Sequence, residues 1–101
     1  MNMKRQGDLL FVRVDGPGPE RGAGTYVIAH GEATGHCHEI AVEDRTSCAV
    51  LGPPAAPSHL TVREPVRVVH PEHRTVVLDP GLWEVRRQRE HTPEGQLLVA
   101  D

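Results

Sequence analysis

The hydrophobic positions of this chain fall into short runs of aliphatic and β-branched residues, each closed by glycine, proline or aspartate. Runs of four to eight such residues between turn residues are typical of β-strands. The candidate strands are residues 8–14, 25–30, 36–42, 47–51, 60–63, 66–69, 75–78 and 82–86. No longer stretch has the period of an amphipathic helix. The pattern therefore predicts an all-β fold, a small single-domain barrel or sandwich of about seven or eight short strands.

Glycine and proline punctuate these runs and set the expected organisation of the chain. Residues 15–19, 52–54 and 79–81 are rich in turn-forming residues. Pro65 separates two of the runs, which indicates an edge strand or a bend at that point. We expect one domain over residues 1–101, in which residues 92–101 are either a loose C-terminal tail or a docked terminal segment.

Residues 36–42 alternate along an extended strand, so that every second side chain shares a face. If Ile40 and Val42 belong to the core, His36 and His38 point inward as well. Their imidazoles would then lie side by side, roughly 6.5–7 Å apart along the strand. Buried imidazoles without partners cost free energy, and a shared metal ion would satisfy both.

Histidine is abundant here, with seven in 101 residues, and a second close pair stands at His70 and His73. Neutral imidazole is the commonest biological metal ligand. A fold that brings His36, His38, His70 and His73 together would supply a three- or four-ligand site. His70 is the better ligand of the second pair, because it continues the alternation of Val66 and Val68. The competing interpretation is that both pairs are hydrated surface residues.

Other groups near these histidines are weaker candidates. Glu32 and Glu72 are the nearby carboxylates that could serve as ligands or general bases. Cys37 and Glu39 point away from the face that His36 and His38 share, which argues against both as ligands.

Three further histidines remain. His30 could lie at the same end of the fold, whereas His59 and His91 look like ordinary polar residues.

Charge and composition limit the expected partners. The net charge is −3, and the one basic cluster, residues 86–89, reads as a solvated strand end rather than a nucleic-acid surface. No apolar run has the roughly 20 residues of a membrane helix. No signal-peptide pattern is present at the start. We therefore expect a cytoplasmic protein with reduced thiols at Cys37 and Cys48, no nucleic-acid or membrane partner, and either a protein partner or self-association.

The segment from Gly31 to His38, with His-x-His after a glycine-containing loop, resembles the first metal motif of cupins. In that comparison Glu43 falls where a cupin glutamate ligand stands. The resemblance is confined to this motif, since residues 79–83 carry no histidine. It implies a metal-dependent enzyme that acts on a small molecule.

A second resemblance covers nearly the whole chain. Residues 5–10, 31–38, 70–73 and 85–93 resemble a family of small bacterial and phage proteins that share a Gly-Glu-x-Thr-Gly-His-x-His signature. Cys37 stands where these proteins usually have alanine, which argues against a ligand role for its thiol. The resemblance implies a single domain and brings no activity with it.

The sequence thus favours a non-catalytic accessory or binding protein with a histidine-rich site for zinc, iron, nickel or copper. Two alternatives stay open. One is a cupin-like metal-dependent enzyme, and the other is a metal-free protein-interaction module.

Overall fold

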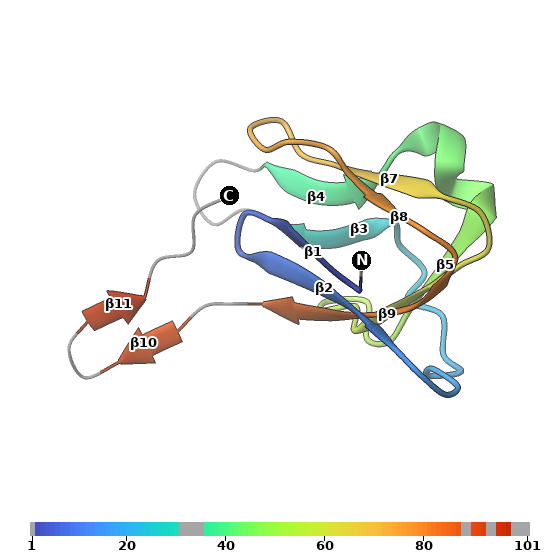
Figure 1. Ribbon diagram of the computed structural model, residues 1–101, viewed down its shortest axis with the longest axis horizontal. Coiled ribbons are helices and arrows are strands. Elements are labelled where there is room, and N and C mark those ends of the chain that lie inside the picture. The colour runs from blue at the N-terminus through green and yellow to red at the C-terminus, as the bar shows by residue number, and fades with distance from the viewer. Residues whose placement is uncertain (1, 31–35, 88–89, 93–94, 98–101) are drawn as a thin grey trace.

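The chain forms two antiparallel β-sheets that enclose one core (Figure 1). The computed structural model describes residues 2–30, 36–87, 90–92 and 95–97, with side chains up to residue 87. No helix within these residues has the length and apolar character needed to cross a membrane.

The first sheet has five strands, each pairing antiparallel with its neighbours. In spatial order they are β1 (Met3–Gln6), β2 (Leu9–Val14), β9 (Gly81–Arg87), β6 (His59–Val62) and β5 (Cys48–Leu51). The second sheet has four strands, also antiparallel. These are β3 (Val27–His30), β4 (Cys37–Ile40), β7 (Val66–Val69) and β8 (Val76–Leu78).

Both sheets contribute to the same hydrophobic core. Phe11 and Trp83 from the first sheet, and Ile28, Ile40 and Val68 from the second, belong to one buried cluster. Two sheets around a shared core form a sandwich. The all-β prediction is therefore confirmed. Of its two alternatives the sandwich is correct, because the described strands around the core form two open sheets and no closed barrel.

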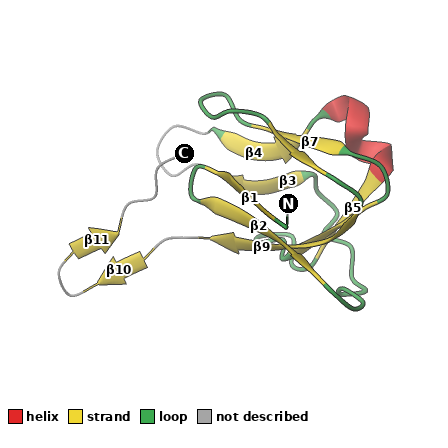
Figure 2. Cartoon of the chain, viewed as in Figure 1, coloured by secondary structure: helices red, strands yellow, loops and turns green. Residues whose placement is uncertain are grey.

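The chain crosses from one sheet to the other at several of the connections between strands. Pro65 lies between β6 of the first sheet and β7 of the second, so the expected bend is a crossing from one sheet to the other. A six-residue 3-10 helix, η1 (Val42–Ser47), makes the crossing from β4 to β5 (Figure 2). The prediction that Val42 continues an inward strand face is wrong, since β4 ends at Ile40 and Val42 is 72% exposed.

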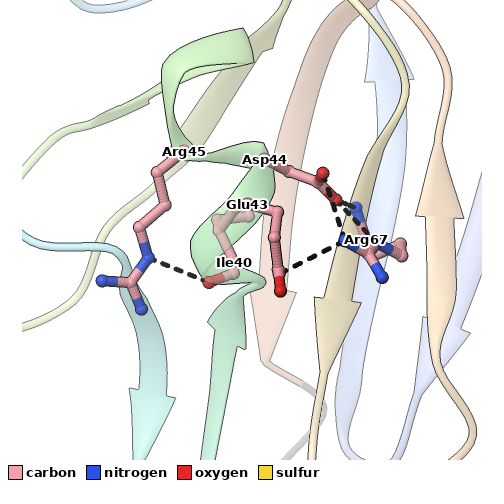
Figure 3. A network of polar contacts seen from close by, with 5 residues as sticks. All are labelled: Ile40, Glu43, Asp44, Arg45 and Arg67. Carbon is pink, nitrogen blue, oxygen red and sulfur yellow. Dashed lines mark hydrogen bonds and ion pairs between the residues drawn. The ribbon is translucent and has the colours of Figure 1, made fainter.

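Charged side chains fasten η1 to the second sheet (Figure 3). Arg67 of β7 donates its Nε–H to Asp44 at 2.9 Å, and its backbone N–H donates to the same carboxylate. Glu43 adds a 3.3 Å contact to Arg67, and Arg45 donates to the carbonyl oxygen of Ile40. The hydrogen bonds from Arg67 lower the pKa of Asp44, so this pairing favours the ionised carboxylate.

The two ends of the chain contain strands that the hydrophobic pattern does not predict. β1 at the N-terminal end is largely exposed, so it lacks the apolar alternation of a half-buried strand. Near the C-terminus, β10 (Glu90–Thr92) pairs with β11 (Gly95–Leu97) as a separate two-stranded sheet. The expected tail therefore contains paired backbone over part of residues 92–101.

Candidate functional site: a histidine cluster at one end of the sandwich

Three segments that are distant in sequence meet at one end of the sandwich. They are the β1–β2 turn, residues 36–38 where β4 begins, and the connection from β7 to β8 (Figure 1). The four histidines predicted as metal ligands lie on the second and third of these segments. Ring contacts link all four of them. The fold thus brings together two pairs that are about thirty residues apart in the chain.

The β1–β2 turn is a two-residue hairpin loop closed by the pairing of Gln6 with Leu9. Gly7 occupies its first central position with φ +59°, the arrangement of a type II′ turn. Glycine is also required for space, because a Cβ at this position would lie 2.7 Å from Nε2 of His73. The tight turn therefore lets the His73 ring lie directly over the backbone and directs Asp8 toward the cluster.

His38 is the buried centre of the cluster, with 4% of its surface exposed. Its Nδ1 lies 2.9 Å from Oε1 of Gln6, and its Nε2 lies 3.5 Å from Oδ1 of Asp8. Burial lowers the pKa of His38 from 6.5 to about 4; the charges of His70 and His73 act in the same direction, and Asp8 opposes them. The metal-free side chain is therefore neutral at pH 7, the state in which imidazole binds a metal.

Gln6 fixes the orientation of His38. It is 1% exposed, and its amide nitrogen donates to the carbonyl oxygens of Val68 at 2.9 Å and Arg74 at 2.8 Å. Both amide hydrogens are thus used, so the amide oxygen must accept the hydrogen bond from His38 Nδ1–H. This assigns the neutral tautomer of His38, with the lone pair on Nε2.

The rings of His38, His70 and His73 are packed closely. Ring centroids are 4.4 Å apart for His38 and His70, 4.4 Å for His70 and His73, and 5.9 Å for His38 and His73. Three imidazoles bound to one tetrahedral ion at about 2.0–2.1 Å per nitrogen would have centroids roughly 5 Å apart. The observed spacings lie on either side of this value, two below it and one above.

His36 lies at the edge of this group. Its ring centroid is 5.8 Å from that of His70, and its side chain is 31% exposed. Nδ1 of His36 lies 3.2 Å from a carboxylate oxygen of Glu72, which comes from the β7–β8 connection. Glu72 therefore contacts the cluster through His36, in the part of the chain where sequence analysis predicted a carboxylate.

In this structure the histidine rings of the cluster are not oriented to bind a common ion. Nδ1 of His70 accepts the backbone N–H of Glu72 at 3.0 Å, so neutral His70 carries its proton on Nε2. Over the described part of the chain, no three His, Cys, Asp or Glu side chains are placed so that they could hold a metal ion as they stand. Metal binding would require His70 to release this hydrogen bond or to rotate its ring.

The other sequence candidates lie elsewhere. Cys37 contacts His30, with 3.4 Å from Sγ to Nδ1, on the opposite face of β4 from His38. Glu39 pairs with Arg45 at 3.1 Å. Glu43, the position of the cupin glutamate, pairs with Arg67 as described above. His59 bonds Ser58, Glu32 lies outside the described residues, and the side chain of His91 is not among those described.

Gln6 and Asp8 are the residues that sequence analysis missed. Both lie about thirty positions before His38, in a segment whose exposed strand has no strong pattern. The one available signal is Gln6-Gly7-Asp8 itself, a glycine turn flanked by polar residues. A turn of this kind predicts a hairpin but does not indicate what its polar side chains contact.

Two surface pockets border the cluster. One of about 310 Å³ is lined by Asp8, Ala29, His30, Ala55 and Arg87. The other, of about 500 Å³, is lined by Arg5, Gln6, Glu72, Arg74, Thr75 and Val76. Within the described residues, the hollows thus border the cluster on the sides of Asp8 and of Gln6.

Residues 5–88 match a family described as a domain of unknown function (DUF8820). The chain belongs to the DUF8820 family. The match contains the whole histidine cluster together with Gln6 and Asp8, so the cluster lies inside the DUF8820 domain. No curated protein and no solved structure matches the chain.

Proposed function

We propose that this protein binds one divalent transition-metal ion at the histidine cluster and acts as a non-catalytic binding or accessory protein. The observation that carries the proposal is the environment of His38. A buried, neutral imidazole packs against His70 and His73 and has its Nε2 lone pair beside a carboxylate. Neutral imidazole with carboxylate is a usual donor set for such ions.

His38, His70 and His73 form the centre of the proposed site. His36, which the sequence also predicts as a ligand, lies at its edge. The residues fit a metal in kind, and binding by Nδ1 of His70 would require it to release the hydrogen bond from Glu72. The set contains no thiolate, which suits zinc, iron, nickel or copper. The proposal keeps the cytoplasmic location and the protein partner or self-association expected from the sequence.

The accessory role is preferred because catalysis needs further groups. An enzyme requires an open metal position, a pocket beside it and a positioned acid or base. The cupin-like enzyme remains the second candidate, and the 310 Å³ pocket that reaches Asp8 is the observation in its favour. The metal-free interaction module is the third, favoured by the hydrogen bond that now occupies Nδ1 of His70.

Metal content measured on untagged protein tests the proposal. Protein stripped with a chelator and titrated with zinc or cobalt should bind about one ion per chain. The His38→Ala variant should lose this binding. His59→Ala is the matched control, because His59 bonds Ser58 and has no ring contact with the cluster in the described structure. Absence of binding by the wild-type protein would refute the metal site and leave the interaction module.

A further inference from the structure

The carboxylate of Asp8 faces the Nε2 atom of His38. Because Gln6 holds the proton of His38 on Nδ1, the Nε2 atom that faces Asp8 is a hydrogen-bond acceptor. A carboxylate oxygen is also an acceptor. Two lone pairs therefore face each other across the 3.5 Å between Nε2 and Oδ1. This arrangement is favourable when a cation lies between the two atoms.

The separation of Nε2 and Oδ1 is longer than a direct charge-assisted hydrogen bond. A charge-assisted hydrogen bond from imidazolium to carboxylate spans about 2.7–2.9 Å. Two ligands on one tetrahedral ion, each bound at about 2.0–2.2 Å, lie roughly 3.3–3.5 Å apart. The observed 3.5 Å agrees with the second value.

The backbone of Asp8 is fixed beside His38, while its side chain is 44% exposed. It occupies the second central position of the β1–β2 turn, whose backbone is fixed by Gly7 and by the pairing of Gln6 with Leu9. His36 is less well placed. Its Nδ1 faces Glu72, and its closest ring contact in the cluster is the 5.8 Å approach to His70.

We infer that Asp8 and His38 bind the same divalent ion, through Oδ1 and Nε2, in a mixed imidazole–carboxylate site. Asp8 then takes the place of His36, which the sequence suggested as a ligand. Gln6 is the positioning residue that holds His38 in the tautomer required for this. The inference rests on the proposed metal site and names one ligand and one positioning residue of it.

Metal affinity separates this inference from the four-histidine site. Asp8→Asn keeps the size and turn preference of the side chain but removes its charge. We expect it to weaken zinc and cobalt binding by more than the roughly 10–100-fold that loss of an outer-shell partner costs. His36→Ala should change the affinity less than Asp8→Asn does. Asp15→Asn, at an exposed aspartate after β2, is the charge-matched control and should bind as the wild type.

Each outcome leads to a different conclusion. If the wild type binds metal and Asp8→Asn binds it equally tightly, the assignment of Asp8 is overturned while the metal site stands. If the wild type binds no metal, the proposed function itself fails. Cobalt absorption gives a second readout, since loss of a carboxylate ligand should change the visible spectrum of the bound ion, whereas a purely structural role for Asp8 would leave it unchanged.

The role of Gln6 is tested on metal-free protein, independently of any binding. Side-chain ¹H–¹⁵N correlation spectra at pH 7 should show His38 as the Nδ1–H tautomer in the wild type. A wild-type His38 with its proton on Nε2 would overturn the assignment of Gln6. In Gln6→Met the fixed tautomer should be lost, with metal affinity reduced about 10–100-fold. The wild-type spectrum gives a result even if this variant does not fold.

Discussion

Acid should destabilise the metal-free protein in part through His38. Burial makes the folded state favour the neutral imidazole, with a pKa of about 4, whereas the ordinary pKa of histidine, taken for the unfolded chain, is 6.5. Between these values the unfolded state binds the proton and the folded state does not. Stability therefore increases with pH across this window. The contribution is complete above about pH 6.5 and is lost as the pH falls toward 4.

The size of the effect follows from the same two values. One pKa unit corresponds to about 1.4 kcal/mol, so a shift from 6.5 to about 4 gives a total near 3 kcal/mol. About 1 kcal/mol should be lost by pH 5.5, and most of the remainder by pH 4. For a domain whose total stability is about 5–15 kcal/mol, this is a large fraction.

Urea unfolding of chelator-treated protein at pH 7, 5.5 and 4.5 measures this loss. Other carboxylates and histidines also titrate, so the test is the difference between the wild type and His38→Gln. The variant has no titrating imidazole at this position, and its unfolding free energy should depend less on pH. His59→Gln controls for loss of a histidine elsewhere. Parallel pH dependences for the wild type and His38→Gln would refute the argument.

Three further predictions concern metal removal, the β1–β2 turn and the η1 contact. At a hundredfold excess of free metal over Kd, binding stabilises the folded state by about 2.7 kcal/mol. A chelator should therefore lower Tm by about 10–20 °C. An unchanged Tm would contradict the metal site. Gly7→Ala should cost about 1–2 kcal/mol of unfolding free energy from its positive φ alone, and should also weaken metal binding because the new Cβ meets His73. Gly16→Ala, with φ +86° and no atom within 4 Å, should show the first loss without the second. Asp44→Asn should lower the urea midpoint at pH 7, because Arg67 lowers the pKa of Asp44 and so favours the ionised carboxylate. The difference in midpoint from the wild type should shrink as acid protonates the carboxylate. A constant difference down to pH 2 would argue against this pairing.

The strands that could be predicted from the sequence are those whose core-facing residues are apolar and repeat along the strand. The run around Phe11 and the alternation of Val66 and Val68 indicate strands because these side chains enter the core. β1 has no such signal, since only Gln6 of its four residues is buried. The sequence places Val42 at the end of one strand, because it fits the alternation, whereas in the structure the chain turns into η1 and exposes it.

The candidate site could be predicted in its histidines but not in their surroundings. Close pairs such as His70 and His73 are visible in the sequence, and the ring contacts show that the fold brings both pairs together. Whether they bind a metal remains a prediction. The contacts of Gln6 with Val68 and Arg74 span more than sixty residues and arise only when the edge of one sheet meets the end of the other. No local pattern carries that information.

The position of the cluster links its chemistry to the stability of the sandwich. Gln6 belongs to the first sheet, while the carbonyl oxygen of Val68 and the ring of His38 belong to the second. These hydrogen bonds therefore join the two sheets at the same end where the proposed ion would bind. A metal held by Asp8 from one sheet and His38 from the other would add a second link across the same junction. Loss of the ion and protonation of His38 should consequently weaken the same contact between the sheets, and in metal-loaded protein the two effects should not add, because proton and metal compete for Nε2 of His38.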